Sequence, residues 1–371
     1  MTAPSLLPPY DLASIPDAPA VFLIHLHQGR PYLARTARLR RRLARLLSPP
    51  TSSSRRLNLH SLAASVEYHL TPSRLSSSLT FYRLAQAHFP GEYLNFLKLR
   101  PAPFVKLILS NPFPRTAVST RLSSSQALHY GPFRSRASAE RFEQDLLDLF
   151  QVRRCQEDLI PSPDHPGCIY GEMMKCLRPC QQVVGPEEYR SEANRLSAFL
   201  STQGHSLLEP VSSARERASQ DLDFEQAQRL HSRYLRIEQT LKLRDDLAAP
   251  LESLSGAAVS PSPVPGEVQL FFFLQGAWAE PVHFPIAATS SEVLPLDRRL
   301  RELLPSLQFP RLTLRQRAEH ISLLARWFYS SYRDSDWFSF TSLDDIPYRR
   351  LVRAISGAGR HASSAPGPAP G

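Results

Sequence analysis

The stretch "CIYGEMMKCLRPC", residues 168–180, contains three of the four cysteines in a chain of 371 residues, and the fourth, Cys155, lies thirteen positions upstream. Cysteines gathered in this way are typical of a metal site, since four thiolates bind zinc or an iron–sulfur cluster. The spacing matches neither the paired CxxC motifs of zinc ribbons nor the compact run of ferredoxins, so it leaves the metal open. We predict a metal site at Cys155, Cys168, Cys176 and Cys180; the alternative is four ordinary buried cysteines.

The ends and the apolar runs of the sequence indicate the compartment. No secretory signal pattern opens the chain, and the longest strongly apolar run, residues 270–274, is too short to span a bilayer. We therefore expect a soluble, cytoplasmic protein without a membrane partner. Cysteines in that compartment are reduced, which favours metal binding over a disulfide framework.

Positive charge is concentrated near the N-terminus. The formal net charge is +10, and residues 1–60 contain nine arginines against Asp11 and Asp17. A basic module of this kind favours a polyanionic partner, most often nucleic acid. The alternative is a solvated surface in an arginine-rich protein, because only four of the 44 basic residues are lysine.

Hydrophobic periodicity predicts an α+β protein. Residues 20–35 read as a β-hairpin with a turn at 27–29, and residues 267–286 read as a second hairpin. Helices are expected at 34–47, 73–89, 135–155, 187–204 and 314–333. The helix over 34–47 places leucines on one side and arginines at helical spacing on the others. We predict that these arginines contact DNA: Arg35, Arg38, Arg42 and Arg45.

Four motifs in order resemble the central region of UvrC, the incision subunit of bacterial nucleotide-excision repair. They are "HYGPF" (129–133), "LDLFQVRRC" (147–155), the cysteine stretch itself, and "EEYRSEANRLSAFL" (187–200). In that family the four cysteines are associated with a four-iron cluster. The resemblance therefore implies a [4Fe-4S] cluster at these positions, with structural zinc as the alternative.

The next segment, "ASQDLDFEQAQRL" (218–230), resembles the UVR motif, a helical hairpin through which UvrC binds UvrB. Two helical runs meet at residues 221–223, and Asp223 is suited to cap the second, with Gln226 three positions on. A hairpin this short cannot bury an apolar strip by itself. We predict a UvrB-like partner, with packing inside this chain as the alternative, at these residues: Ala218, Leu222, Phe224, Glu225, Ala227 and Leu230.

The resemblance also implies an N-terminal GIY-YIG nuclease domain, in which two catalytic groups are replaced. Tyr32 matches the tyrosine of the second motif strand, and Arg42 matches the catalytic arginine. Phe22 stands at the first tyrosine and Phe81 at the metal-binding glutamate. Phenylalanine supplies no oxygen to a metal, so Mg²⁺ is not expected, and the domain is predicted to bind DNA without cutting it.

The motifs and the composition divide the chain as follows: 15–100, a degenerate GIY-YIG domain; 101–203, the cysteine region; 204–248, the UVR hairpin; 249–266, a linker; 267–350, a small α/β region; and 351–371, a disordered tail. The small α/β region weakly resembles the opening of the UvrC C-terminal half. Its strand at 267–274 lacks a catalytic aspartate.

These patterns predict a UvrC-like repair protein that binds DNA and a UvrB-type partner without nuclease activity of its own. Two alternatives stay open at this point. One is an active endonuclease that incises damaged DNA with another metal ligand. The other is an interaction module that has kept only the UVR hairpin.

Overall fold

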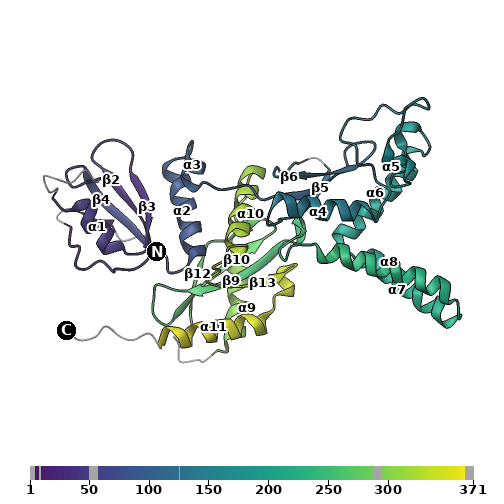
Figure 1. Cartoon of the computed structure of the whole chain (residues 1–371). Helices are drawn as coiled ribbons and strands as arrows, with labels where there is room; N and C mark the ends of the chain where they lie inside the picture. The colour runs from purple at the N-terminus through teal and green to yellow at the C-terminus, as the bar shows by residue number, and fades with distance from the viewer. Residues whose placement is uncertain (1–4, 8–9, 50–56, 125, 288–293, 364–371) are drawn as a thin grey trace.

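The computed structural model describes residues 5–7, 10–49, 57–124, 126–287 and 294–363. Helices and strands are mixed along this part of the chain, so the predicted α+β class is confirmed. The described strands form antiparallel sheets in three separate regions, which follow one another along an elongated molecule (Figure 1). None of the described helices is long and apolar enough to cross a membrane.

The N-terminal sheet has the strand order β1-β4-β2-β3, with β1 at Ser5–Leu6, β2 at Ala20–Leu26, β3 at Tyr32–Thr36 and β4 at Ala63–Leu70. Strands β2 and β3 form the predicted hairpin. Helix α1 (Leu39–Leu47) covers one face, on which its leucines pack against Phe22 and Ile24. Helix α2 (Arg74–His88) covers the other face, on which Val21 and Leu23 are buried.

The helix expected over 34–47 begins only at Leu39, so that expectation is corrected for Arg35. Residues 32–36 continue β3, because Ala20 pairs with Thr36 and Val21 pairs with Arg35. The Thr36 hydroxyl then accepts the Arg38 backbone N–H at 3.2 Å, which closes a turn before the helix. Arg35 therefore lies on the sheet and not on the basic helix.

The central sheet has the order β6-β5-β7-β8, with β5 at Phe104–Ile108, β6 at Arg115–Ser119, β7 at Ala127–Gly131 and β8 at Ala249–Pro250. Gly131 has a φ of +154°, and a Cβ there would lie 2.8 Å from the Phe104 ring, which explains the glycine. Helix α4 (Arg136–Leu147) packs on this sheet and is shorter than the expected 135–155. Beyond it lie helix α5 (Ile169–Glu172), the 3-10 helix η1 (Pro179–Gln181) and helix α6 (Pro186–Ser201).

The predicted helical hairpin is present, with α7 at His205–Gln220 and α8 at Phe224–Lys242. Asp223 caps α8 as expected, since its carboxylate accepts the Gln226 backbone N–H at 3.0 Å. Figure 1 shows the hairpin projecting from the rest of the molecule, with its connecting turn at the far end. Near its base, Arg236 binds Asp145 of α4 at 2.7 Å, which anchors the hairpin to the central region.

The C-terminal sheet has the order β11-β10-β9-β13, and β12 also pairs with β10. Its strands are β9 (Ser255–Pro261), β10 (Glu267–Leu274), β11 (Ala277–Trp278), β12 (Val282–Pro285) and β13 (Asp336–Phe340). The helices of this region are α9 (Leu296–Leu303), α10 (Leu314–Phe328) and α11 (Tyr348–Ser363). The short 3-10 turns are η2 (Leu251–Ser253), η3 (Leu304–Ser306) and η4 (Leu343–Asp345).

Two expectations fail in this region. The stretch 249–266 is not a linker, because β9 lies between β10 and β13 and is buried along most of its length. A Cβ on Gly256 would lie 2.2 Å from the Trp337 indole, so the small residues of β9 make room for aromatic neighbours. The expected disordered tail, 351–371, is helical up to Ser363, and residues 364–371 lie outside the described ranges.

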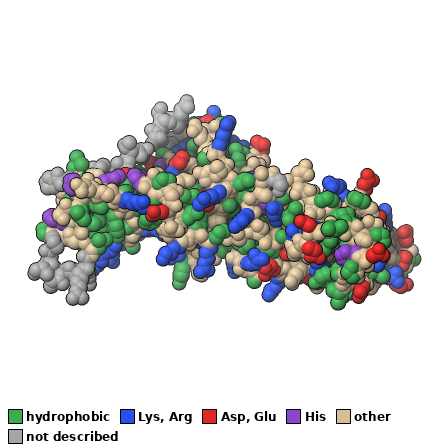
Figure 2. Space-filling view, turned by 90° about the horizontal axis from the view of Figure 1, so that it is seen from above, with side chains coloured by type: hydrophobic (Ala, Val, Ile, Leu, Met, Phe, Trp, Pro, Cys, Tyr) green, Lys and Arg blue, Asp and Glu red, His purple; other side chains and the backbone are tan. Residues whose placement is uncertain are grey.

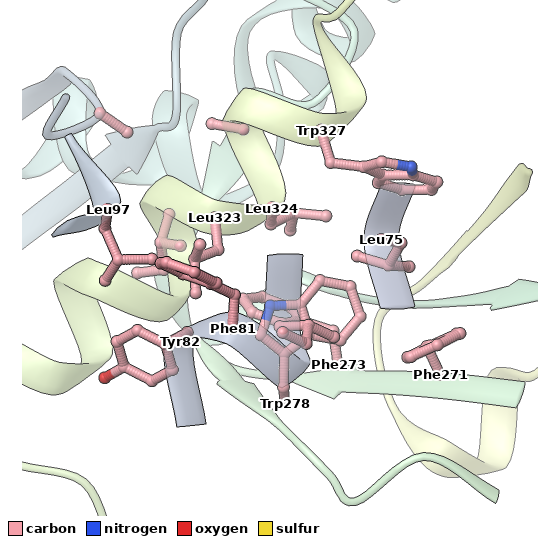
Figure 3. Packing of buried hydrophobic residues seen from close by; sticks show 14 of the residues in the cluster. Leu75, Phe81, Tyr82, Leu97, Phe271, Phe273, Trp278, Leu323, Leu324 and Trp327 are labelled. Atoms are coloured by element: carbon pink, nitrogen blue, oxygen red, sulfur yellow. The ribbon is translucent and has the colours of Figure 1, made fainter. Parts of the chain in front are cut away.

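The largest core joins the N-terminal and C-terminal parts of the chain. Leu75, Phe81 and Tyr82 of α2 lie against residues of α10 and β10 (Figure 3). The Glu319 carboxylate of α10, buried in this contact, accepts the hydroxyls of Tyr82 and Tyr93 at 2.8 and 2.9 Å. This core crosses the boundary that was predicted at residue 100, so α2 and α3 (Tyr93–Leu97) are shared between two regions.

Candidate functional site

The four cysteines lie in one neighbourhood of the central region. Cys168 caps α5 and is exposed, Cys155 is half-buried, and Cys176 and Cys180 are buried. Burial, with smaller effects of the other three cysteine thiols, raises the pKa of the Cys176 thiol to about 11. Burial raises the pKa of Cys180 as well, with added effects of Cys168 and Cys155. The four thiols are thus close enough to change one another's pKa values.

Across the part of the chain that the structure describes, no group of three or more His, Cys, Asp or Glu side chains is arranged to hold a metal ion. The metal site expected at the four cysteines therefore stays a prediction. What the structure does provide is a set of four free thiols in a loop-rich segment, where neighbouring thiolates would repel one another unless a cation lay between them.

A buried arginine lies beside this group. Arg153 is 1% exposed, and its guanidinium binds backbone carbonyls of Phe113 at 3.0 Å and Glu157 at 2.7 Å. It also approaches the Cys155 sulfur at 3.5 Å, and its Nη2 is buried without a hydrogen-bond partner among the described atoms. A buried guanidinium is costly unless an anion offsets its charge. Its placement beside a thiol fits a negatively charged thiolate centre. The burial of Arg153 could not be read from the motif alone.

The matched remnants of the nuclease motif, Tyr32 and Arg42, lie together on the α1 side of the N-terminal sheet. Arg42 Nη2 donates to the Tyr32 hydroxyl at 3.0 Å, and Arg42 Nε is buried without a partner in the described atoms. The Phe22 ring is fully buried, with its centre 6.1 Å from that of Tyr32. A phenylalanine at this point adds packing where the family motif has a hydroxyl.

Phe81 is buried on the other side of the same sheet. It is 5% exposed and belongs to the core that joins α2 to α10. The Arg35 guanidinium lies 4.4 Å from the centre of its ring. Because side chains alternate along a strand, Arg35 and Tyr32 point to opposite faces of β3. The structure thus brings Arg42 to Tyr32 and Arg35 to Phe81, but it does not join the two pairs on one face.

The basic helix presents its arginines unevenly. Arg38 and Arg45 are exposed, as a DNA contact requires, whereas Arg42 is half-buried through its bond to Tyr32. Arg40 and Arg41, which were not assigned a role from the sequence, are exposed on the same helix. The leucine face is buried as predicted: Leu39, Leu43, Leu46 and Leu47.

Glu67 of β4 is bound by two histidines. Its carboxylate lies 3.0 Å from His69 Nε2 and 3.6 Å from His25 Nε2. Glu67 pairs with Leu23 across the sheet, so it lies on the α2 side, away from Tyr32 and Arg42. The only sequence signal for this cluster is the alternation of Glu67 and His69 along a strand.

The residues predicted for partner binding divide into two groups. Leu222 and Phe224 are 71% and 68% exposed at the turn of the hairpin, and Glu225 is exposed with an ion pair to Arg229. Ala218 is buried, and Ala227 and Leu230 are half-buried between the helices. Among the residues predicted for partner binding, the exposed apolar ones lie at the turn and the start of α8.

Residues 103–199 match the UvrC/Cho excinuclease middle domain. UvrABC system protein C of Moorella thermoacetica is 24% identical over 323 residues, which are 85% of this chain and 52% of that protein. The same protein of Acetivibrio thermocellus is 25% identical over 76% of this chain and 45% of its own length. That of Nitratidesulfovibrio vulgaris is 27% identical over 62% of this chain and 34% of its own length.

These matches confirm the resemblance predicted from the motifs: residues 103–199 match the UvrC middle domain, and most of the chain is similar to proteins named UvrABC system protein C. The chain spans about half the length of the curated relatives it matches. Among solved structures, none matches it significantly.

Proposed function

We propose that the protein acts in nucleotide-excision repair as a UvrC-like subunit that binds DNA and a UvrB-type partner and does not cut DNA with its N-terminal domain. The middle domain and the similarity along most of the chain to proteins named for the UvrABC system support the repair role. The basic N-terminal helix supports the DNA contact, because exposed arginines attract phosphate.

The observation that carries the loss of cutting is the burial of Phe22 and Phe81 at the two replaced positions. Hydrolysis by this class of nuclease needs a carboxylate to hold a divalent metal near the phosphate. Phe81 instead fills a core and contacts Arg35, so it is part of the packing of the domain. The bonded pair of Tyr32 and Arg42 retains a cation that can contact phosphate.

For the central region we propose a [4Fe-4S] cluster held by Cys155, Cys168, Cys176 and Cys180, with structural zinc as the alternative. The proximity of the four thiols and the uncompensated charge of buried Arg153 support an anionic centre. Such a centre would cross-link loops that have little regular structure, which is a stabilising role in its own right. Arg153 would offset part of its charge and hold Cys155 in place.

For the hairpin we propose that a UvrB-type helical hairpin covers Leu222 and Phe224. The exposed pair lies at the end of a projecting element, where a second hairpin can pack without displacing other parts of the chain (Figure 1). Adjacent Glu225 and Arg229 would form the polar margin of that contact.

The proposal can be tested with purified protein, damaged duplex DNA and a UvrB-type protein. We expect DNA binding that weakens steeply with salt, no incision with Mg²⁺ or Mn²⁺, and capture of the partner. Phe224→Asp should abolish the capture without unfolding the protein, because the side chain is exposed. Leu235→Asp, at a less exposed position further along α8, is the matched control. Incision that disappears in Arg42→Ala would refute the loss of cutting.

A further inference from the structure

Two hollows meet where the N-terminal, central and C-terminal parts of the chain come together. One, of about 300 Å³, lies between β3, α2 and the end of α10, and the other, of about 460 Å³, lies between α3, α10 and the segment after β7. Both are lined by Arg326 of α10, so they adjoin. We call the continuous surface that they form the basic seam, after its six cationic lining residues: Arg35, Arg74, Lys98, Arg100, Arg134 and Arg326.

The seam has a one-sided charge. No carboxylate among the described residues lines either hollow, and all six cations are exposed. Among the described residues, none of these six side chains forms an ion pair with a carboxylate, although other arginines of the molecule do. The neighbouring Asp334 is occupied by the backbone N–H of Arg74 and the indole of Trp327. The positive charges of the seam are thus left for an external anion.

Aromatic rings contact three of these cations without neutralising their charge. Arg74 lies 5.2 Å from the ring centre of Tyr332, and Arg134 lies 5.3 Å from that of Tyr329. In the same way Arg35 lies over Phe81. A cation on a ring face is oriented by the quadrupole of the ring but keeps its full charge.

Arg326 fixes the middle of the seam. Its Nη1 donates to the Leu97 carbonyl at 3.0 Å, which places the guanidinium between the two hollows. Desolvation of the guanidinium, and then the charge of Arg326, lowers the pKa of Arg35, which indicates that these two cations lie close enough to repel. Like charges held together in this way destabilise a protein unless an anion is bound between them.

We propose that the basic seam binds the sugar–phosphate backbone of a nucleic acid strand that passes from the N-terminal sheet over α10 to the central region. The inference rests on the proposed DNA binding and names a surface for it beyond the basic helix α1. A single small anion would occupy one hollow, whereas a chain of phosphates matches cations on both sides of Arg326. Ser77 and Ser78 supply hydroxyl groups in the first hollow.

Figure 2 shows Lys and Arg side chains spread along one face of the molecule, with Asp and Glu side chains among them. The aromatic side chains that line the seam offer little face for base stacking, since Trp327 and Phe133 are buried and Tyr329 is half-buried beside Arg134. Recognition there should therefore follow charge and not base sequence.

The test compares two triple variants with equal loss of charge. Arg74→Gln, Arg100→Gln and Arg326→Gln remove three of the six positive charges of the seam. The control changes Arg141, Arg190 and Arg233 to Gln; these exposed residues lie on α4, α6 and α8 and form no ion pair within the described chain. Affinity for a fluorescent duplex of mixed sequence is measured by anisotropy over a range of salt concentrations, and folding is checked by thermal unfolding.

We expect the seam variant to bind about 10- to 100-fold more weakly near physiological salt, with a salt slope less steep by about 2.7, while the control stays within about twofold. Arg100→Glu alone, an exposed change that leaves the Arg326–Leu97 contact intact, should weaken binding in the same direction. Binding of the seam variant equal to that of the control would overturn the seam while leaving the proposed function in place. Absence of salt-dependent binding by the unmodified protein would overturn both.

Discussion

The Arg35 guanidinium lies 4.4 Å from the centre of the Phe81 ring, on the side of the N-terminal sheet that faces α2. The ring belongs to the core that joins the two ends of the chain, and Arg35 borders the basic seam. A position that the UvrC resemblance assigns to a metal ligand therefore supports a cation in this protein. Under the proposed function, a ring in place of the family's carboxylate would leave the positive charge of Arg35 available to DNA.

Phe81→Glu should not restore cutting. The new carboxylate would be drawn to Arg35 in a buried place, and Phe22 would still lack the hydroxyl of the first motif tyrosine. Loss of the ring from the core should lower the free energy of unfolding by about 3 kcal/mol. Urea unfolding and a nicking assay with Mg²⁺ or Mn²⁺ measure the two effects.

Phe81→Leu is the control for the loss of the ring, because it keeps the position apolar. We expect it to cost about 1 to 2 kcal/mol, which is less than the glutamate variant. Metal-dependent nicking by Phe81→Glu, absent from Phe81→Leu, would contradict the inactivity that we assign to the domain.

Much of the fold could be predicted from local patterns. The hairpin of β2 and β3 and the break between α7 and α8 follow from alternation and from the cap at Asp223, which depend on neighbours in sequence. Strand β9 could not be predicted, because its serines, glycine and proline resemble a linker. Only the tertiary neighbour Trp337 explains why Gly256 must be small.

The candidate sites show the same division. The cysteines were found because they are clustered in the sequence. The seam was missed because its cations come from strands, helices and loops between residues 35 and 326, and each looks like an ordinary surface residue by itself. Arg153 was recognised as a motif residue, but its burial beside Cys155 depends on the folding of the whole loop.

Arg42→Ala should reduce DNA affinity several-fold and make the salt slope less steep by about 0.9, if its guanidinium neutralises one phosphate. Tyr32→Phe is the matched control, because it removes the hydrogen bond to Arg42 and leaves the charge. Anisotropy titrations of both variants distinguish the effect of the Arg42 charge from the effect of its hydrogen bond to Tyr32. Equal weakening in the two variants would indicate that the bond, and not the charge, is what matters.

Leu222→Gly should stabilise the hairpin while it weakens partner binding. Leu222 has a φ of +58°, a left-handed conformation that costs a branched side chain about 1 kcal/mol and costs glycine little. The same change removes a side chain that is 71% exposed at the proposed contact. The midpoint temperature of thermal unfolding should rise, while capture of a UvrB-type protein should fall. Leu235→Ala, within the regular helix, is the control and should leave the capture unchanged. A fall of both the unfolding temperature and the capture in Leu222→Gly would contradict the proposed contact at Leu222.

Anaerobically purified protein should contain iron and sulfide in about equal amounts and absorb broadly near 400 nm if the four cysteines hold a cluster. Cys176→Ser should remove the colour and the iron. Met173→Ala, an exposed change in the same loop, should retain them. Zinc at about one ion per chain without colour would favour the alternative metal, and metal content unchanged by Cys176→Ser would exclude both.

Acid should destabilise the protein through His320, which is buried in α10 beside the core that joins the two ends of the chain. Its Nδ1 accepts the Trp278 backbone N–H at 3.1 Å, and burial, with a smaller effect of Arg83, lowers its pKa to about 4. A histidine with a folded pKa below its unfolded value of about 6.5 binds its proton more readily when unfolded, so stability falls as pH decreases from about 6.5 towards 4. From pH 7 to pH 5 the expected loss is about 2 kcal/mol. In urea titrations, His320→Gln should make the free energy of unfolding depend less on pH. His205→Gln, at an exposed position, is the control and should retain the dependence. An equal dependence on pH in all three proteins would show that other groups determine the acid sensitivity.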